Sequence, residues 1–270
     1  MKARHAADLG VIGGSGLYSL LTDVEEVAVD TPYGATSAPI TIGEVAGLSI
    51  AFLPRHGLGH SLPPHMVPYR ANIWALGQLG VAAIYAPCAS GSLQPDIHPG
   101  EFVIVDQLVD HTWGRASTFF DGPALSDGTA APAGFDRVNH VGFGDPYDAE
   151  LRAAAIKACD DEGVVVHRAG TVVVINGARF STRAESRWYR DQGWHVINMT
   201  QMPEAVLARE LEIPYAAIAL ITDYDVGLEG TAGIEAATMQ EIFAMLERNA
   251  ERVRGVLVRA VERLPQTLRA

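Results

Sequence analysis

The chain has 270 residues, 48% of them hydrophobic and 19% charged, so it is long enough for a sizeable buried core and is not disordered by composition. Its formal net charge at pH 7 is −12. An acidic surface repels nucleic-acid phosphates and anionic lipids, which disfavours DNA, RNA or a membrane as its partner.

The two cysteines, Cys88 and Cys159, show no metal-ligand spacing, and so few in a long chain favour a reduced, intracellular protein. The first 18 residues contain glycines and no continuous apolar stretch, so no signal peptide is predicted. The longest strongly apolar runs, such as Tyr215–Thr222, are too short to span a bilayer. We therefore expect a soluble cytoplasmic protein.

The first half of the chain alternates short apolar runs with one helical pattern. The expected strands are Leu9–Ile12, Leu48–Leu53, Val81–Pro87 and Phe102–Val105, and the expected helix is Tyr69–Leu79. Residues 112–146 are rich in Gly, Pro, Asp and Ala and predict a long irregular segment. Irregular segments of this length inside a compact domain are usually lids or contact a partner.

The second half continues the alternation. The expected helices are Ala149–Glu162, Ser181–Gln192, Glu204–Leu211 and Ile234–Leu264, and the expected strands are Ala169–Ile175, His195–Asn198 and Tyr215–Thr222. Continuous apolar strands between helices predict an α/β fold with a sheet covered on both faces. No repeat or linker is visible, so all 270 residues are assigned to a single domain.

Polar clusters follow three of the early strands, where ligands of α/β sheets gather. Gly13-Gly14-Ser15-Gly16 offers backbone N–H groups and a hydroxyl to phosphate, although a tight turn explains it equally well. Arg55-His56-Gly57, with His60 one turn later, suits an oxyanion, but a surface pair is the simpler interpretation in isolation. Cys88-Ala89-Ser90-Gly91-Ser92 is expected to be a strand end whose small residues expose backbone donors, and a simple turn is the alternative.

Two more clusters follow strands of the second half. Asn198-Met199-Thr200 places a methionine between two polar side chains, and a core methionine with a helix-capping threonine is the alternative. Thr222-Asp223-Tyr224-Asp225 ends the most apolar strand. Two partly buried carboxylates raise each other's proton affinity, so Asp223 and Asp225 are candidates for a general acid, against the alternative of a loop with two solvated aspartates.

Taken in order, the segments of residues 8–260 resemble the purine nucleoside phosphorylase superfamily, and within it the trimeric methylthioadenosine phosphorylases. The resemblance implies a central twisted mixed β-sheet covered by helices on both faces. The matching segments are Val11–Leu17, Asp30–Gly34, Arg55–Gly57, Tyr69–Leu76, Arg179–Ser186, Asn198–Thr200 and Thr222–Asp225.

The resemblance also implies roles for particular residues. Phosphate would be held by Ser15, Arg55, His56, the Ala89 backbone and Thr200. A purine would pack against Phe180 between Asp223 and Asp225, with Ser181 and Asn198 lining the base pocket and Met199 under the ribose. His60 would lie near the 5′ end of the nucleoside, and His140 would reach that end from a neighbouring subunit of a homotrimer. No metal and no organic cofactor is implied; inorganic phosphate is the co-substrate.

This chain departs from many relatives at two places. Cys88 stands where they have a threonine, which removes one hydroxyl donor from the phosphate site. Asn176-Gly177-Ala178 stands where they have a Gly-Pro, which changes the approach to the base pocket.

The predicted reaction is phosphorolysis of 5′-methylthioadenosine to adenine and 5-methylthioribose 1-phosphate, in purine and methionine salvage. Phosphate would stabilise the positive charge on the sugar ring, and Asp223 would protonate N7 of the departing base. Several alternatives remain open: a phosphorylase of 6-oxopurine nucleosides or of another 5′-substituted adenosine, a phosphate-independent nucleosidase, and a non-catalytic nucleoside-binding protein.

Overall fold

The computed structural model describes residues 7–14, 21–228, 230–231, 234, 238–265 and 268. The strands are β1 (Leu9–Gly13), β2 (Thr22–Val27), β3 (Ile40–Val45), β4 (Leu48–Pro54), β5 (Ile84–Ser92), β6 (Phe102–Val103), β7 (Gln107–His111), β8 (Val166–His167), β9 (Thr171–Ile175), β10 (Val196–Asn198) and β11 (Tyr215–Tyr224). The helices are α1 (Tyr69–Gln78), α2 (Ala149–Asp161), α3 (Arg183–Asp191), α4 (Gln201–Glu210) and α5 (Met239–Glu262), with short 3₁₀ turns η2 (Leu58–His60), η3 (Pro64–Met66) and η4 (Val226–Leu228). Over these residues, no helix combines the length and the apolar character needed to cross a membrane.

All eleven strands of the described residues belong to one mixed sheet. Its main path runs β2-β3-β4-β1-β5-β10-β9-β7, and β11 pairs with β5 and with β6, which in turn pairs with β8. The strands β1, β4, β5 and β11 form the parallel centre, whereas β10 runs antiparallel to β5. The α/β architecture and the mixed sheet that we expected are confirmed.

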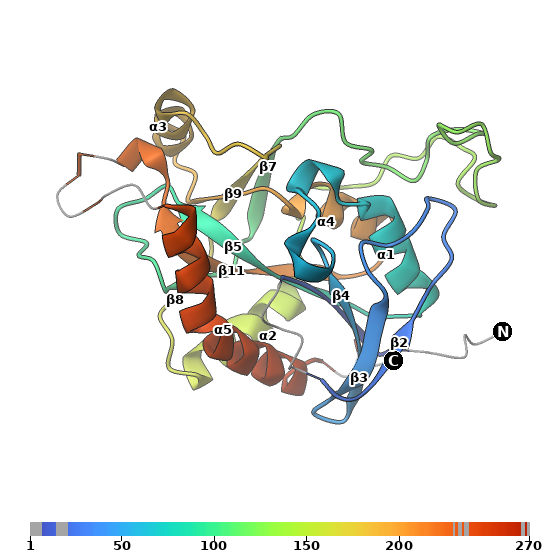
Figure 1. The fold of residues 1–270 in the computed structure, drawn as a ribbon, viewed down its shortest axis with the longest axis horizontal. Helices are drawn as coiled ribbons and strands as arrows, with labels where there is room; N and C mark the ends of the chain where they lie inside the picture. The colour runs from blue at the N-terminus through green and yellow to red at the C-terminus, as the bar shows by residue number, and fades with distance from the viewer. Residues whose placement is uncertain are drawn as a thin grey trace.

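Helices cover both faces of this sheet, α1 and α4 on one side and α2 and α5 on the other (Figure 1). Successive residues of a strand point to opposite faces. In β11, Ala217, Ala219 and Ile221 accordingly join the core beneath α1 and α4, and Ala216, Ile218 and Leu220 join the core beneath α2 and α5. A strand buried on both faces has a continuous apolar run as its sequence, which is why the pattern of residues predicts β11.

The sequence patterns missed four strands, β2, β3, β7 and β8. β2 has the sequence TDVEEV and lies at one end of the main path, while β7 lies at the other end and its side chains are exposed or half-buried. Edge strands are partly solvated, so their residues carry no continuous apolar run.

One expected strand end is wrong, and so is the alternative of a turn there. The small residues Cys88–Ser92 predict a departure from the sheet, but β5 continues through them to Ser92 because β11 and β10 pair with this stretch on either side. Its small side chains leave space above the centre of the sheet.

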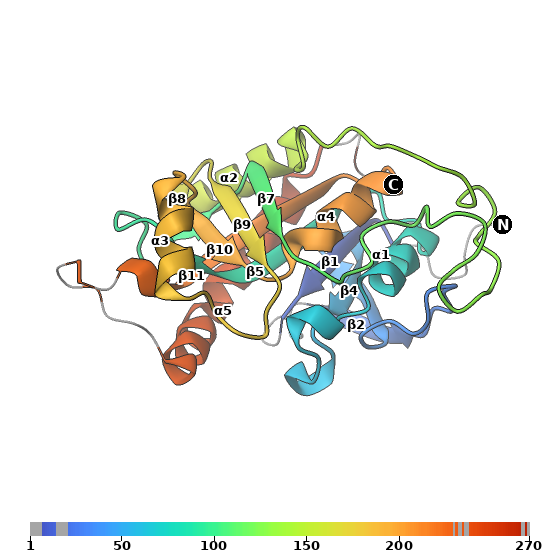
Figure 2. The same cartoon turned by 90° about the horizontal axis from the view of Figure 1, so that it is seen from above.

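The expected irregular segment is confirmed: between His111, where β7 ends, and Ala149, where α2 begins, the only pairing is a bridge from Ala124 to Ala130. This segment crosses the end of the molecule near α1 and β2 (Figure 2). It is anchored by Phe119, which is fully buried against Trp74 and Tyr33.

Candidate active site

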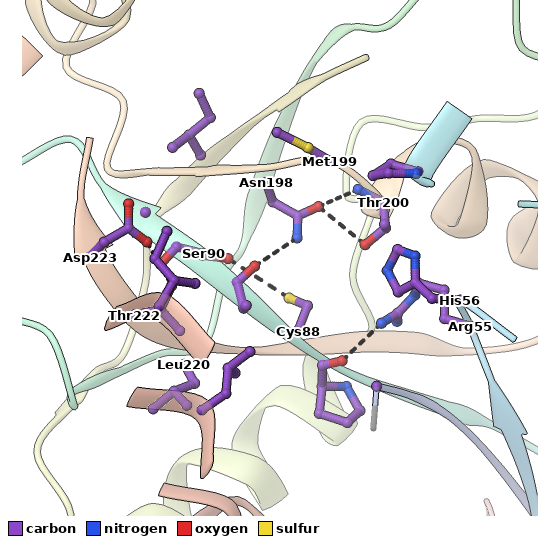
Figure 3. A pocket seen from close by; sticks show the side chains of 18 of the residues that line it. Arg55, His56, Cys88, Ser90, Asn198, Met199, Thr200, Leu220, Thr222 and Asp223 are labelled. Carbon is purple, nitrogen blue, oxygen red and sulfur yellow. Dashed lines mark hydrogen bonds between the residues drawn. The ribbon is translucent and has the colours of Figure 1, made fainter. Parts of the chain in front are cut away.

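A cavity of about 250 Å³ opens where β1, β4, β10 and β11 end and where the small residues of β5 pass beneath it (Figure 3). Eleven predicted site residues line it: Arg55, His56, His60, Cys88, Ala89, Phe180, Asn198, Met199, Thr200, Asp223 and Asp225. Residues remote from one another in the chain therefore meet in one hollow, as ligand sites of open α/β sheets do.

Three predicted residues are placed differently. Ser181 lies behind the cavity wall and contacts Asp225 rather than the open space. His140 is exposed and does not line the cavity of its own chain. Ser15 lies outside the residues that the structure describes.

Asp223 and Asp225 form one end of the cavity. The Asp223 carboxyl accepts a hydrogen bond of 2.7 Å from the Thr222 hydroxyl. Burial raises the pKa of Asp223, the Thr222 hydrogen bond opposes this shift, and the negative charge of Asp225 adds to it. A carboxyl group with a raised pKa and an open side towards a cavity can carry a proton and transfer it to a ligand.

A β-bulge sets the direction of Asp223. Ile221 pairs with Ser90 and Asp223 pairs with Gly91, so Thr222 is the extra residue on β11. Bulges re-aim side chains at the ends of strands. The position opposite also has to be small, because a Cβ on Gly91 would lie 3.3 Å from a carboxylate oxygen of Asp223.

Asp225 is held from behind. The Ser181 hydroxyl donates to the two carboxylate oxygens of Asp225, at 2.9 and 2.7 Å. Among the described residues, no hydrogen bond joins Asp225 to Asp223. Ser181 is placed by the start of α3, where the Thr182 side chain accepts from the backbone N–H of Glu185 in a capping box. The geometry thus favours Asp225 as a charge beside Asp223 rather than as a partner that shares its proton.

A second contact presses α3 against the chain that follows Asp225. The Gly227 N–H of η4 donates to the Ser186 hydroxyl at 2.9 Å, and Ser186 is 1% exposed. A Cβ on Gly227 would lie 2.4 Å from that oxygen and 2.8 Å from the backbone nitrogen of Arg187. Only glycine lets η4 lie close enough for Ser181 to reach Asp225.

Gly227→Ala is therefore expected to push η4 away from α3 and to misplace Asp225. We expect the KM for a substrate that binds at the Asp223 end of the cavity to rise about 10- to 100-fold, while the KM for a substrate that binds at the opposite end changes little. Steady-state kinetics with each substrate varied in turn would test this. Gly144→Ala is the matched control, because a Cβ there meets nothing within 4 Å. An equal rise in both KM values would show a general loss of structure instead.

Arg55 lies at the other end of the cavity and is already paired inside the protein. It is 2% exposed, and its Nε and Nη2 donate to the two carboxylate oxygens of Glu204 at 2.5 and 3.1 Å. Nη1 donates to the Pro87 carbonyl at 3.1 Å, and Nη2 also donates to the Ile12 carbonyl at 2.9 Å. Four of its five N–H donors are used, which leaves one for a ligand.

The ring of His56 also has a fixed role for one nitrogen. Its Nδ1 lies 2.9 Å from the Leu62 carbonyl oxygen, which can only accept, so Nδ1 carries a proton. Burial and the charge of Arg55 lower the pKa of His56 to about 4, against the opposing effect of the Leu62 carbonyl. At neutral pH the ring is therefore uncharged.

Between the two ends, Asn198 organises the floor of the cavity. Its side-chain oxygen accepts from the backbone N–H groups of Thr200 and Gln201 at 2.7 and 3.0 Å, and its amide donates to the Ala89 carbonyl at 3.2 Å. Asn198 therefore caps α4, whereas the Thr200 hydroxyl makes no capping hydrogen bond. This arrangement excludes the alternative of a capping threonine and leaves the Thr200 hydroxyl at the cavity surface.

Apolar side chains form the third wall. Ile242, Phe243 and Leu246 of α5 line the cavity, and the Phe243 ring lies edge-on to His60 with centroids 5.9 Å apart. Phe180 also lines the cavity and is half exposed. The cavity thus has an acidic end, an end with donors and an apolar flank.

The departure at Asn176 has a structural partner. Arg115 of the irregular segment donates to the side-chain oxygen of Asn176 at 3.2 Å and to its backbone oxygen at 2.6 Å. The guanidinium also donates to the Tyr69 hydroxyl at 3.2 Å. Arg115 thereby fixes the stretch that leads into Phe180.

Two features of the site were not predicted. Glu204, the fully buried partner of Arg55, had a sequence signal: an acidic residue beside Ala205, Leu207 and Ala208 at the start of an expected helix is typical of a carboxylate paired with an internal cation. The particular α5 residues of the apolar wall had none, because one amphipathic helix packs on the sheet with most of its apolar face and lines the cavity with the remainder.

Comparison with known proteins decides the family. Residues 8–262 match the family model described as the Phosphorylase superfamily. The chain belongs to this superfamily.

Several members are close to it in sequence. The chain is 52% identical to S-methyl-5′-thioadenosine phosphorylase of Mycolicibacterium smegmatis, over 94% of this chain and 90% of that protein. It is 51% identical to a purine nucleoside phosphorylase of Streptomyces coelicolor, over 98% and 92% of the two chains. The structure of methylthioadenosine phosphorylase from Schistosoma mansoni in complex with adenine superposes with a TM-score of 0.86 at 36% identity, over 95% of this chain and 91% of that one.

Proposed function

We propose that the protein catalyses the phosphorolysis of 5′-methylthioadenosine to adenine and 5-methylthioribose 1-phosphate. The observation that carries the proposal is Asp223, a partly buried carboxyl group with a raised pKa at one end of a cavity whose other end offers donors to an anion. Overall identity does not choose the substrate, since relatives with two different names are 51% and 52% identical to the chain. The choice therefore rests on the chemistry of the cavity.

The acidic end supports a 6-aminopurine. An exocyclic amino group donates hydrogen bonds and suits a carboxyl oxygen, whereas a 6-oxo group is an acceptor and would face the carboxylates without a donor. In the reaction, an unprotonated phosphate oxygen bonds to the anomeric carbon as the bond from that carbon to N9 breaks. The electrons of that bond pass to the purine, and Asp223 gives its proton to N7 of the purine. The sugar phosphate product then loses its phosphate proton to water, and Asp223 takes up a proton from water in turn.

The apolar flank supports a methylthio group rather than a free 5′-hydroxyl. Ile242, Phe243 and Leu246 supply no hydrogen-bond partner for a hydroxyl. An apolar substituent of this size buried against such a wall contributes about 1–2 kcal/mol.

The remaining roles are part of the same proposal. Arg55, His56, Thr200 and the Ala89 backbone bind phosphate, and Phe180 and Met199 pack on the base and the ribose. The reaction needs no metal and no organic cofactor, because phosphate and Asp223 together handle the charge that develops. The copies form a homotrimer, in which His140 of the partner subunit completes the 5′ end of the site; the exposure of His140 supports this role. The protein acts in the cytoplasm, and the unpaired state of Cys88 and Cys159 supports this location.

The test is adenine release from methylthioadenosine with and without inorganic phosphate, before and after dialysis against a chelator. Adenosine, inosine and methylthioinosine serve as comparison substrates. We expect no release without phosphate, no effect of the chelator, and the highest kcat/KM for methylthioadenosine. Release without phosphate would identify a nucleosidase, and preference for the inosine compounds would overturn the role of Asp223. Binding without turnover would identify a non-catalytic protein.

A further inference from the structure

The anion end of the cavity carries little net charge. The positive charge of Arg55 is neutralised by its ion pair with the fully buried Glu204. Glu204 also accepts a hydrogen bond of 3.0 Å from the Tyr215 hydroxyl. A buried pair with both carboxylate oxygens in use acts on its surroundings as a dipole rather than as a free cation. An anion entering here meets one guanidinium N–H and no uncompensated charge from Arg55.

His56 presents an acceptor to the cavity. Because its Nδ1 proton is committed to the Leu62 carbonyl, the neutral ring has its lone pair on Nε2, which makes no hydrogen bond within the described part of the chain. The charged or titratable groups against this ring are Arg55, the residue before it, and His60, stacked on it with centroids 4.3 Å apart. Both oppose a positive charge on His56, and neither supplies a negative charge that would favour one.

Cys88 does not replace the missing donor. Its thiol lies 3.4 Å from the side-chain nitrogen of Gln201, which donates to it, and 3.9 Å from the Ile218 carbonyl. Burial raises the pKa of this thiol, so it stays protonated, and a thiol is a weak donor. The anion end of the cavity thus has few hydrogen-bond donors, and Nε2 of His56 adds an acceptor beside them.

We propose that the anion site selects tetrahedral oxyanions that bring a proton of their own, such as hydrogen phosphate and hydrogen arsenate, over fully ionised ones such as sulfate. The P–OH group of hydrogen phosphate donates to Nε2 of His56, while the unprotonated oxygens accept from Arg55, Thr200 and the backbone. Sulfate has no proton to donate and faces a lone pair. It binds only when His56 takes up a proton from solvent. This inference rests on the proposed phosphate-binding role of the cavity.

The test is direct binding of phosphate, arsenate and sulfate to the intact protein by titration calorimetry between about pH 7.5 and about pH 9, where phosphate and arsenate are mainly singly protonated dianions. Proton linkage makes the sulfate affinity fall about tenfold per pH unit, or about 30-fold over this range. The phosphate and arsenate affinities are expected to change less than about threefold, since no proton is exchanged with solvent. The preference for phosphate over sulfate then rises with pH.

His56→Gln tests the role of the Nε2 acceptor, because the glutamine amide can donate or accept a hydrogen bond and does not titrate. We expect its sulfate affinity to be independent of pH and its preference for phosphate to be lost. His65→Gln, which alters an exposed imidazole outside the cavity, is the matched control and should keep the wild-type pH slopes.

Equal pH slopes for sulfate and phosphate in the wild type would overturn the proposal, as would an unchanged preference in His56→Gln. Calorimetry needs no turnover, so these outcomes are separate from the fate of the proposed reaction. If the protein binds the three anions as expected but releases no adenine, the proposed anion selectivity holds and the proposed reaction is wrong.

Discussion

Asp223→Asn is expected to lower kcat/KM for methylthioadenosine about 10²- to 10⁴-fold, the usual range for loss of a general acid. The amide cannot give up a proton to N7, and its NH₂ group faces the 6-amino group of the base as a second donor. Activity on 6-oxopurine nucleosides is expected to rise relative to the wild type, because the same NH₂ group can donate to a 6-oxo oxygen. Kinetics with methylthioadenosine and methylthioinosine would measure both changes.

The same substitution is expected to stabilise the protein at neutral pH. Burial raises the pKa of Asp223 in the folded state, so its ionisation costs folding free energy. The stability that the protonated carboxyl contributes is fully present below the unfolded pKa and is lost as the pH rises through the folded pKa. Asparagine does not ionise, and chemical denaturation at two pH values should show its advantage only at the higher one.

Asp96→Asn, on an exposed turn outside the cavity, is the control and should match the wild type in both respects. Full activity of Asp223→Asn on methylthioadenosine would rule out Asp223 as the proton donor. A loss of activity on both substrates with lower stability would point to a structural role.

Glu204→Gln is expected to destabilise the fold by about 3–5 kcal/mol, because it leaves the Arg55 guanidinium as an uncompensated charge in the interior. Arg55 and Glu204 are 2% and 0% exposed, so water cannot replace the lost carboxylate. Urea denaturation of the wild type and the variant would measure the change in the free energy of unfolding.

Replacing both partners separates the unpaired charge from the lost contact. Arg55→Met combined with Glu204→Met removes the charge together with its partner and is expected to be less destabilising than Glu204→Gln alone. Asp160→Asn breaks the exposed pair with Arg168 and should change stability by less than about 1 kcal/mol. The single variants Arg55→Met and Glu204→Met complete the cycle, and a double variant as unstable as the sum of these two would mean that the charges do not depend on each other.

The sequence determined the parts of this protein that depend on neighbours along the chain. A run of apolar residues such as Tyr215–Ile221 is typical of a strand buried on both faces, and the alternation of such runs with helices favours an α/β fold. Polar residues that follow these strands come to one edge of the sheet, so residue order alone places Arg55, Asn198 and Asp223 together. The edge strands β2 and β7 were not predicted, because half-solvated strands do not carry a continuous run of apolar residues.

Only the tertiary structure decided what those side chains do to one another. Whether Arg55 is a free cation depends on Glu204, 149 positions away, and the tautomer of His56 depends on the Leu62 carbonyl. The position of Asp225 depends on the contact between Ser186 and Gly227. Charge, tautomer and orientation come from distances between segments remote in the chain, and residue order does not encode those distances directly. The residue types of a site can therefore be predicted from a sequence, whereas its electrostatics requires the packed fold.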